Sequence, residues 1–514
     1  MTTLDDDKPM WGLGEVLKLS WPASLTMLSS TLMQFVDAWM VSFTGPVALG
    51  AQFVGGIASF VPASIGLGTL TVVNTYVSQN LGANRCKRCG QYAWAGLTIA
   101  LLCSVLAIPL VIWAGPLFAL FNHTSEVWSL ETMYFRYLTS AMIFFLAGRA
   151  LEQFFFGLHR PGIVLLGALA ANLFNVGCNY VLIFGKLGFP AMGLEGAAIG
   201  TVLGNVLLLA VLGSAYLSRS MHTRYATRLV RAMKLSQCAE LLRVGWPAGV
   251  QFCNDVLSWN VFVAVLVGRF GTIHLAASTA AMRFMSLSFM PAVGVGVATT
   301  ALVGRHIGHG RPDIARRRAH AAALAAMAYM TACATAFLVF RHEMVGLFAN
   351  IPHSPDISAA EARALTDKMV AIGGWVMICA AVFQTFDALG IVFMGALRGA
   401  GDTFWPMILS AGFSWLLTAG GGAAMVFLVP QLESVGPWMA ASAYVIVLGI
   451  VLAWRFETGR WRKIDLLGTA AAPVPAGESL QASIAGGLAP DTPANPEAFS
   501  AVDDEPHDEH SDTD

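Results

Sequence analysis

Blocks of about twenty or more apolar residues recur along most of the sequence, and they restrict the chain to very few folds. A block of this length crosses the hydrocarbon core of a bilayer as a single α-helix. Hydrophobic residues make up 56% of the 514 residues and charged residues only 12%, about half the charged share of a soluble protein. Transmembrane β-barrels are excluded because their strands are short and alternate in polarity.

Twelve of these blocks are predicted to be transmembrane helices, which makes the chain an all-α polytopic membrane protein. Glycine and proline inside the blocks are compatible with spanning helices, because neighbouring helices satisfy the freed backbone groups. The approximate limits are residues 15–43, 50–78, 91–115, 131–156, 162–184, 193–217, 240–268, 275–303, 319–340, 369–395, 404–428 and 436–456.

Lysine and arginine are distributed unequally between the two sets of loops that these spans define. With both termini in the cytoplasm, 21 of these residues fall in inside segments and only 5 in outside loops. Cytoplasmic loops carry such an excess, so both termini are predicted to be cytoplasmic. Residues 1–12 are acidic and lack the basic segment and cleavage site of a signal peptide, which predicts an uncleaved first span.

Short motifs recur between the two halves of the chain. VLKLSWPA at 16–23 returns as LLRVGWPA at 241–248, 225 residues later, and VSQNLGANR at 77–85 returns as VGRHIGHGR at 303–311. Each repeat holds six spans, so both repeats begin on the same side and their pseudo-symmetry axis is expected to lie along the membrane normal. The chain is therefore predicted to form two pseudo-symmetric six-helix lobes.

The domain limits follow from this repeat and from composition. The connection between the lobes is basic and polar, and the last segment is rich in Ala, Pro and acidic residues and is too polar to form a packed core. The predicted parts are an N-lobe at 1–217, a cytoplasmic linker at 218–239, a C-lobe at 240–463 and a disordered acidic cytoplasmic tail at 464–514.

Three acidic residues, Asp37, Asp255 and Asp387, lie inside predicted spans. A carboxylate in hydrocarbon is unfavourable by at least a few kcal/mol, so it normally faces a protein interior or a water-filled cavity. Burial raises the proton affinity of such a group and a nearby cation lowers it, so it can exchange a proton, a sodium ion or a cationic substrate. The alternative is a structural role, in which each acid is satisfied by a hydrogen bond or by Arg149 or Arg283.

Polar residues accompany these acids. Asn175 and Asn179 are one helical turn apart in the fifth span, and Thr201 follows in the sixth; their oxygens suit sodium, but helix–helix hydrogen bonding explains them equally well. Gln251 shares a helix face with Asp255, with Asn254 beside it, and Phe383 and Gln384 precede Asp387 by one turn. Arg149 and Glu152, three residues apart, are predicted to form a local ion pair.

Enzyme signatures are lacking. The eleven histidines fall in predicted loops, span ends or the tail, and the sequence has no HExxH, GxSxG or P-loop motif. We therefore predict a protein that is not an enzyme, without cofactor and without metal other than sodium at the sites above. A channel is also possible on these grounds, but two similar lobes around mid-membrane acids favour alternating access.

Taken together, these motifs resemble the MATE (multidrug and toxic compound extrusion) family of transporters, and most closely its NorM-type bacterial branch. The resemblance extends over residues 15–456 and is carried by QFVDAWMVS, VSQNLGANR, FFGLHRPG, NVGCNYVLIFGKLGFPAMGLEGAAIGT, GWPAGVQFCND, HIGHGRPDIAR and GALRGAGDT. It implies a two-lobe fold around a central cavity and export of cationic or amphipathic drugs in exchange for sodium or protons. It also implies a monomer in the inner membrane that does not bind nucleic acid.

The resemblance also assigns site residues. Asp37 matches the acid of the first helix, and Asn175, Asn179 and Thr201 match the polar positions grouped with it in an N-lobe cation site. In the C-lobe, Asp255 and Asp387 match the acids of the seventh and tenth helices, with Gln251, Asn254 and Phe383 beside them. The sequence has Asp255 where the family usually has Glu, and Phe383 where an aromatic hydroxyl is common. A flippase for lipid-linked precursors is the alternative function.

Overall fold

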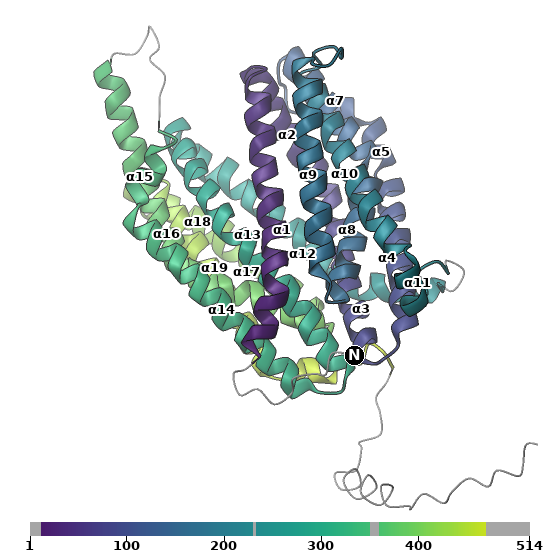
Figure 1. The fold of residues 1–514 in the computed structure, drawn as a ribbon. Helices are drawn as coiled ribbons and strands as arrows, with labels where there is room; N and C mark the ends of the chain where they lie inside the picture. Colours follow the sequence, from purple (N-terminus) through teal and green to yellow (C-terminus); the bar gives the residue numbers. More distant parts are fainter. Residues whose placement is uncertain (1–11, 230–232, 350–358, 469–514) are drawn as a thin grey trace, which may run out of the picture. The chain divides into compact units, whose positions relative to one another are not determined.

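The computed structural model describes residues 12–229, 233–349 and 359–468. Over these ranges the chain consists of helices joined by short connections (Figure 1). The described residues up to Leu467 belong to one compact unit. This arrangement confirms the prediction of an all-α polytopic membrane protein.

The first half of the chain contributes helices of the predicted N-lobe and the start of the linker. They are α1 Leu13–Ser42, α2 Pro46–Leu70, α3 Val72–Gly82, α4 Cys86–Leu106, α5 Ile108–Ile112, α6 Ala114–Ala119, α7 Ser125–Ser140, α8 Met142–Gly157, α9 Pro161–Phe184, α10 Leu194–Tyr216 and α11 Arg219–Tyr225.

The second half contains longer helices and two π-helical stretches, η2 and η4. The helices are α12 Leu235–Val261, η2 Phe262–Val267, η3 Gly268–Phe270, α13 Thr272–Gly308, α14 Pro312–Val339, α15 Arg341–Gly346, α16 Ala359–Ala400, α17 Phe404–Phe413, η4 Ser414–Gly421, α18 Gly422–Leu428, η5 Pro430–Leu432, α19 Val435–Glu457 and η6 Arg460–Lys463.

Each of the twelve predicted spans coincides with one of these helices or with consecutive ones. Among the described residues, ten helices are long and apolar enough to cross a membrane. The remaining two predicted spans correspond to α1 and to α7 with α8, and these carry Asp37 and the Arg149–Glu152 pair. The spans that carry Asp255 and Asp387 are among the ten.

The repeated WPA motif packs one repeat against the other. Helix α1 lies against α13, and α12 lies against α2. A side chain at Gly294 would collide with the Ala23–Ser24 backbone, and one at Gly68 would collide with the Ala248 backbone. Small residues let these helix backbones approach closely. Because Ala23 and Ala248 are 225 residues apart, the same contact is made twice.

Helix α3 joins the two halves at the end of the unit where the arginine-rich connections lie. The Thr75 hydroxyl donates to the Arg398 carbonyl at 2.9 Å, and the Gln79 amide donates to the Gly399 carbonyl at 2.9 Å. Thr75 and Gln79 belong to the first repeat and Arg398 and Gly399 to the second, so these bonds connect the two repeats directly.

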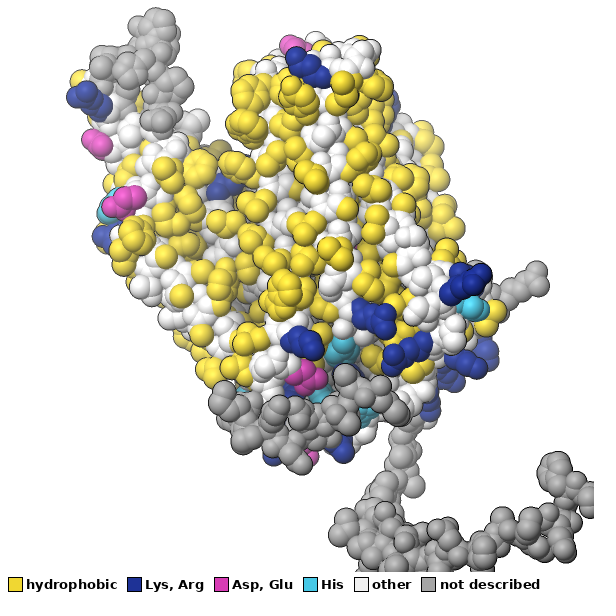
Figure 2. Space-filling view, viewed as in Figure 1, with side chains coloured by type: hydrophobic (Ala, Val, Ile, Leu, Met, Phe, Trp, Pro, Cys, Tyr) yellow, Lys and Arg dark blue, Asp and Glu magenta, His cyan; other side chains and the backbone are white. Residues whose placement is uncertain are grey.

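The surface has the polarity expected of a membrane protein. Figure 2 shows apolar side chains over the middle of the visible face and a concentration of Lys, Arg and His at its lower end. Large apolar side chains such as Leu106, Trp113 and Leu173 are exposed. Such a surface is stable only in contact with lipid or a partner.

The predicted linker and tail are only partly described. In the linker, α11 packs its Met221 and Tyr225 inward. Leu466 contacts the core, and the Leu467 carbonyl accepts a hydrogen bond from Arg85, so the first residues after Lys463 still pack on the unit. The rest of the predicted tail and the acidic N-terminal segment lie outside the described residues. The lobe limits themselves remain a prediction.

Candidate cation and substrate sites

Asp37 of α1 is buried, with 8% of its surface exposed, and it faces α9. The side-chain amide of Asn179 donates to Asp37 Oδ1 at 2.6 Å and also to Asn175 Oδ1 at 3.1 Å. Asn175 and Asn179 are fully buried, and their spacing of four places both on one face of α9. The structure therefore brings three of the four predicted N-lobe residues together.

Two polar atoms of this cluster have no partner within the described part of the chain: Asn179 Oδ1 and Asn175 Nδ2. The Asn179 oxygen lies against Gly200 of α10, where a side chain would collide with it. A buried acceptor without a donor is unfavourable by about 1–3 kcal/mol. Together with the Asp37 carboxylate, this oxygen belongs to the ligand type that hard cations such as sodium prefer.

Thr201 lies on α10, and its hydroxyl donates to the backbone of Ala197 at 3.0 Å. It also interacts with the hydroxyl of Tyr134, a buried residue of α7 that is close enough to Asp37 to interact electrostatically. Gln52 of α2 approaches the same hydroxyl. Sequence reasoning did not select Tyr134. Its position as a hydroxyl-bearing residue inside the predicted span 131–156 was the available signal.

In the C-lobe, Asp255 of α12 accepts a hydrogen bond from Ser410 of α17 at 2.7 Å. Gln251 and Asn254 lie beside the Asp255 carboxylate, as the helical spacing predicts. Asn254 is held by Trp415, whose indole donates to it at 2.8 Å. About two turns after Asp255, the α-helical hydrogen-bonding pattern changes to a π-helical one at η2, which begins at Phe262; such a deviation is frequent at functional sites.

Tyr444 of α19 lies close enough to both Asp387 of α16 and Asp255 to interact with them electrostatically. The Tyr444 hydroxyl lies 3.3 Å from that of Ser410. Within the described ranges, no hydrogen bond joins the Asp387 side chain to another residue. Sequence reasoning did not select Ser410 or Tyr444, although both carry a hydroxyl group and lie within predicted spans.

Phe383 lies one turn before Asp387 on α16. Its side chain is buried in the core of the C-lobe, in the same cluster as Phe262, Met377 and Tyr444. The side-chain amide of Gln384 donates to the Ser288 hydroxyl at 2.5 Å. The role of Phe383 at the site remains a prediction.

Arg149 and Arg398 each interact with an identified acidic residue. Arg149 pairs with Glu152 at 2.7 Å, which confirms the local ion pair and gives Arg149 a partner other than the three aspartates. The cation that acts on Asp255 is Arg398 of α16, a residue of the GALRG motif. In the part of the chain that is described, no cluster of three or more His, Cys, Asp or Glu side chains could hold a metal ion.

Two six-helix repeats with acids inside the spanning helices of both halves are typical of membrane transporters. The family model MatE matches residues 22–181 and 247–420, more than half of the chain. The two matched segments begin directly after Trp21 and Trp246, which the internal repeat aligns. The chain therefore belongs to the MATE family of transporters.

Three bacterial relatives resemble the chain over nearly its whole membrane region. A probable multidrug resistance protein NorM of Mesorhizobium japonicum is 29% identical over 446 residues, 86% of this chain and 92% of the relative. Its counterpart in Rhizobium meliloti is 30% identical over 443 residues, with the same coverage. The multidrug resistance protein NorM of Burkholderia vietnamiensis is 27% identical over 86% of this chain and 93% of the relative.

Solved structures share the fold. An outward-facing multidrug resistance MATE transporter superposes with a TM-score of 0.77 at 19% identity, covering 89% of this chain and 99% of that one. A eukaryotic MATE transporter gives 0.76 at 17% identity, covering 88% and 96%. At these identities the likeness establishes the twelve-helix MATE fold.

Proposed function

We propose that this protein is a multidrug efflux transporter that exports cationic or amphipathic small molecules in exchange for sodium or protons. It acts as a monomer in the inner membrane, with both termini in the cytoplasm, and needs no cofactor besides the coupling ion. The observation that carries the proposal is the buried Asp37–Asn179 contact with an unpartnered Asn179 oxygen beside it. The names of the bacterial relatives support the substrate class.

In the N-lobe, Asp37 is the exchangeable group. A buried carboxylate is unstable without a cation or a proton, so loading and release of the coupling ion change the balance of interactions around α1. Asn175, Asn179 and Thr201 supply neutral ligands. The Asn179 oxygen accepts the ion in the loaded state, and the Asn179 amide satisfies Asp37 in the unloaded state.

In the C-lobe, Asp255 and Asp387 bind a second ion or the positive charge of the substrate. The Ser410 hydroxyl bonds to Asp255 and lies 3.3 Å from the Tyr444 hydroxyl, which interacts electrostatically with both acids. In this proposal these hydroxyls transmit the charge state of one acid to the other. Because these acids come from α12 and α16, a relative movement of the helices alters the site.

The membrane potential supplies the driving force. Moving one charge through 100 mV releases roughly 2.3 kcal/mol, so a net inward movement of charge in each cycle drives export. The mid-membrane carboxylates favour cationic cargo over the anionic head of a lipid-linked precursor, which the flippase alternative would require.

The decisive experiment measures dye efflux in everted membrane vesicles driven by an imposed sodium or proton gradient. We expect Asp37→Asn to abolish gradient-driven efflux and to leave the folded protein intact by gel filtration. Glu126→Gln, at the exposed start of α7, is the matched control. Wild-type rates in Asp37→Asn would refute the proposed role of Asp37, and the absence of gradient-driven efflux in the wild type would refute the function.

A further inference from the structure

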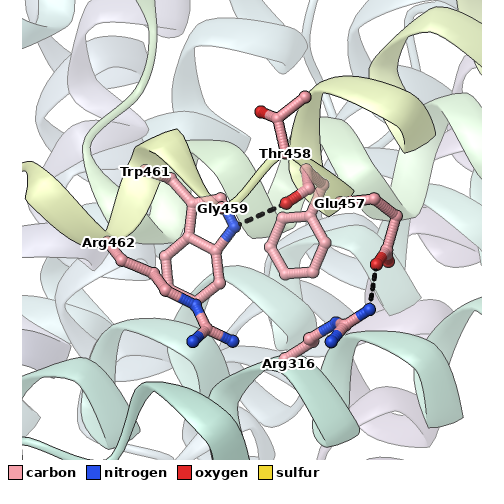
Figure 3. Close-up of a pocket in the computed structure, with 7 residues that line it drawn as sticks. Arg316, Glu457, Thr458, Gly459, Trp461 and Arg462 are labelled. Carbon is pink, nitrogen blue, oxygen red and sulfur yellow. Dashed lines mark hydrogen bonds and ion pairs between the residues drawn. The ribbon is translucent and has the colours of Figure 1, made fainter.

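A cavity of about 340 Å³ opens at the arginine-rich end of the unit, away from the sites above. It lies between the start of α14 and the end of α19 with η6, and Figure 3 shows the residues that line it. The side chains of Arg316 and Arg462 form part of its lining. Their side chains are 49% and 37% exposed, respectively.

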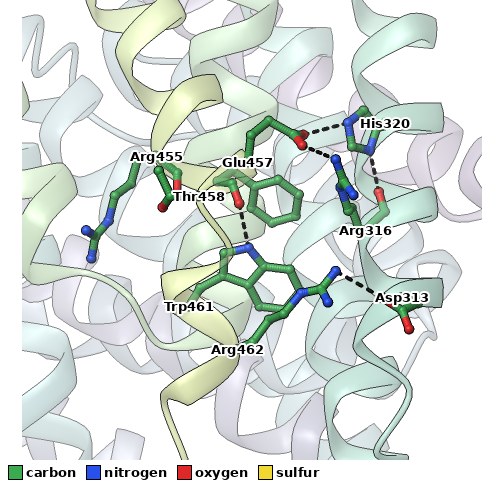
Figure 4. Close-up of polar contacts among 9 residues, drawn as sticks. Asp313, Arg316, His320, Arg455, Glu457, Thr458, Trp461 and Arg462 are labelled. Carbon is green, nitrogen blue, oxygen red and sulfur yellow. Dashed lines mark hydrogen bonds and ion pairs between the residues drawn. The ribbon is translucent and has the colours of Figure 1, made fainter.

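The turn after α19 places Trp461 in the lining of the cavity. Gly459 takes a left-handed conformation, with φ of 67°, and ends α19, so η6 turns back under the helix. Trp461 then stacks on Phe456 with ring centroids 4.9 Å apart and donates to the Phe456 carbonyl at 2.8 Å (Figure 4). The Arg462 guanidinium lies over the Trp461 ring, 5.5 Å from its centroid.

Opposite charges position the two arginines and leave them accessible. Glu457 pairs with Arg316 and also with His320, at 2.7 Å from the latter (Figure 4). Asp313 pairs with Arg462 at 3.0 Å but is 77% exposed. An exposed pair of this kind contributes little, so a phosphate group can compete with the carboxylates for the guanidinium groups. Arg460 and Lys463 add positive charge next to the cavity.

An apolar surface continues from the cavity toward the membrane. On α14, Arg316 and His320 are followed one turn later by Leu324, which is 61% exposed. On α19, the cavity residue Thr458 is preceded one turn earlier by Trp454, which is 66% exposed. Both helices pack on α16, so two exposed apolar faces flank that helix directly beyond the charged cavity.

We propose that this cavity binds the headgroup of an anionic phospholipid from the adjacent leaflet, with the phosphate between Arg316 and Arg462. The acyl chains lie along Leu324 and Trp454. Planar guanidinium groups match phosphate oxygens in a bidentate geometry, and basic pockets between transmembrane helices bind such headgroups. The site does not depend on which solute the protein transports.

The test compares lipid retention by the purified full-length protein, measured by native mass spectrometry after mixing with dioleoyl phosphatidylglycerol or dioleoyl phosphatidylcholine. We expect preferential retention of phosphatidylglycerol by the wild type. The affinity is expected to fall on the order of tenfold in Arg316→Gln/Arg462→Gln. In Glu457→Gln it is expected to rise, because a competing carboxylate is removed.

Arg317→Gln is the control, because it removes one positive charge, against two in the double variant, from the same turn of α14 as Arg316 at an exposed position that does not line the cavity. An equal loss of phosphatidylglycerol retention in this variant, or unchanged retention in the double variant, would overturn the proposed lipid site. If the double variant does not fold, Arg462→Gln alone carries the test, since it leaves the Arg316–Glu457 pair intact. Displacement by glycerol 1-phosphate at equal concentration would identify a soluble phosphate site instead and overturn the lipid assignment.

Discussion

Gly82 and Gly308 pack against each other's helices in a reciprocal way. A side chain at Gly82 would collide with the Arg305 carbonyl, and one at Gly308 would collide with the Gln79 carbonyl. The two glycines are related by the internal repeat, as are Gln79 and Arg305. His309 adds a hydrogen bond to the Gly82 carbonyl. This contact holds α3 against α13 at the arginine-rich end, and an alternating-access cycle, if the proposed function holds, requires it to separate.

Gly308→Ala is expected to loosen this closed end. Forcing a methyl group into a tight helix crossing is unfavourable by about 1–3 kcal/mol, which shifts the equilibrium away from the closed arrangement. We expect faster hydrogen–deuterium exchange in residues 77–85 and altered efflux. Gly213→Ala, in the open part of α10, is the control. Equal exchange in Gly308→Ala and wild type would argue against a gate at this crossing.

Asn179→Leu is expected to weaken coupling-ion binding on the order of tenfold, because it removes both the donor to Asp37 and the free oxygen. The measurement is the ion concentration that gives half-maximal efflux. Asn172→Leu is a matched control, since it breaks another hydrogen bond between α9 and α1, to Ser29 at 2.7 Å. If both variants behave alike, Asn179 serves helix packing only.

Asp387→Asn is expected to reduce the affinity for cationic dyes and to leave that for neutral dyes nearly unchanged. A carboxylate that contacts a cation contributes on the order of 1 kcal/mol or more at a buried site, about a fivefold change in the half-saturating dye concentration. The same comparison applies to Asp255→Asn. Equal losses for cationic and neutral dyes would point to a structural role for the acid.

Tyr444→Phe tests the connection between these two acids. The substitution keeps the ring and removes the hydroxyl near Ser410, so we expect a change in dye affinity without loss of the folded protein. Tyr216→Phe is the control, because its buried hydroxyl donates only to the Gly90 carbonyl, at 3.0 Å, in the N-lobe. Wild-type dye affinity in Tyr444→Phe would show that the Tyr444 hydroxyl plays no part in dye binding.

Protonation of His159, in the connection between α8 and α9, is expected to make the free energy of unfolding depend on pH. Burial, and then the charge of Arg305, lower its pKa to about 3, and both ring nitrogens are buried without a partner among the described residues. Between this value and the ordinary pKa of about 6.5, the unfolded chain binds a proton that the folded protein does not. Stability therefore falls as pH decreases through this window and is unaffected by His159 above it.

The expected effect at pH 5 is a loss of about 2 kcal/mol relative to pH 7.5. Thermal unfolding of the detergent-solubilised protein measures it. His159→Gln is expected to show a smaller loss over the same range, and His342→Gln, at an exposed position on α15, the wild-type loss. A His159→Gln variant with the full wild-type pH dependence would contradict the assignment.

The spans and part of the N-lobe site were predictable from sequence because they depend on local properties. Hydropathy over about twenty residues identifies a span, and a spacing of four places Asn175 and Asn179 on one face. The same local reasoning explains the Arg149–Glu152 pair. It also selected Phe383, which shares the helix of Asp387 and packs in the same buried cluster as Tyr444.

The partners of the acids were decided by tertiary structure. Tyr134, Ser410, Tyr444 and Arg398 each reach an acid from a different helix, and their contacts depend on how the helices cross. The sequence alone determined that three carboxylates lie in the membrane, because a charge within an apolar block is visible in the order of residues. Which atoms satisfy each carboxylate was determined only by the packing of distant helices, since a hydrogen bond requires contact and sequence spacing specifies contact only within one helix.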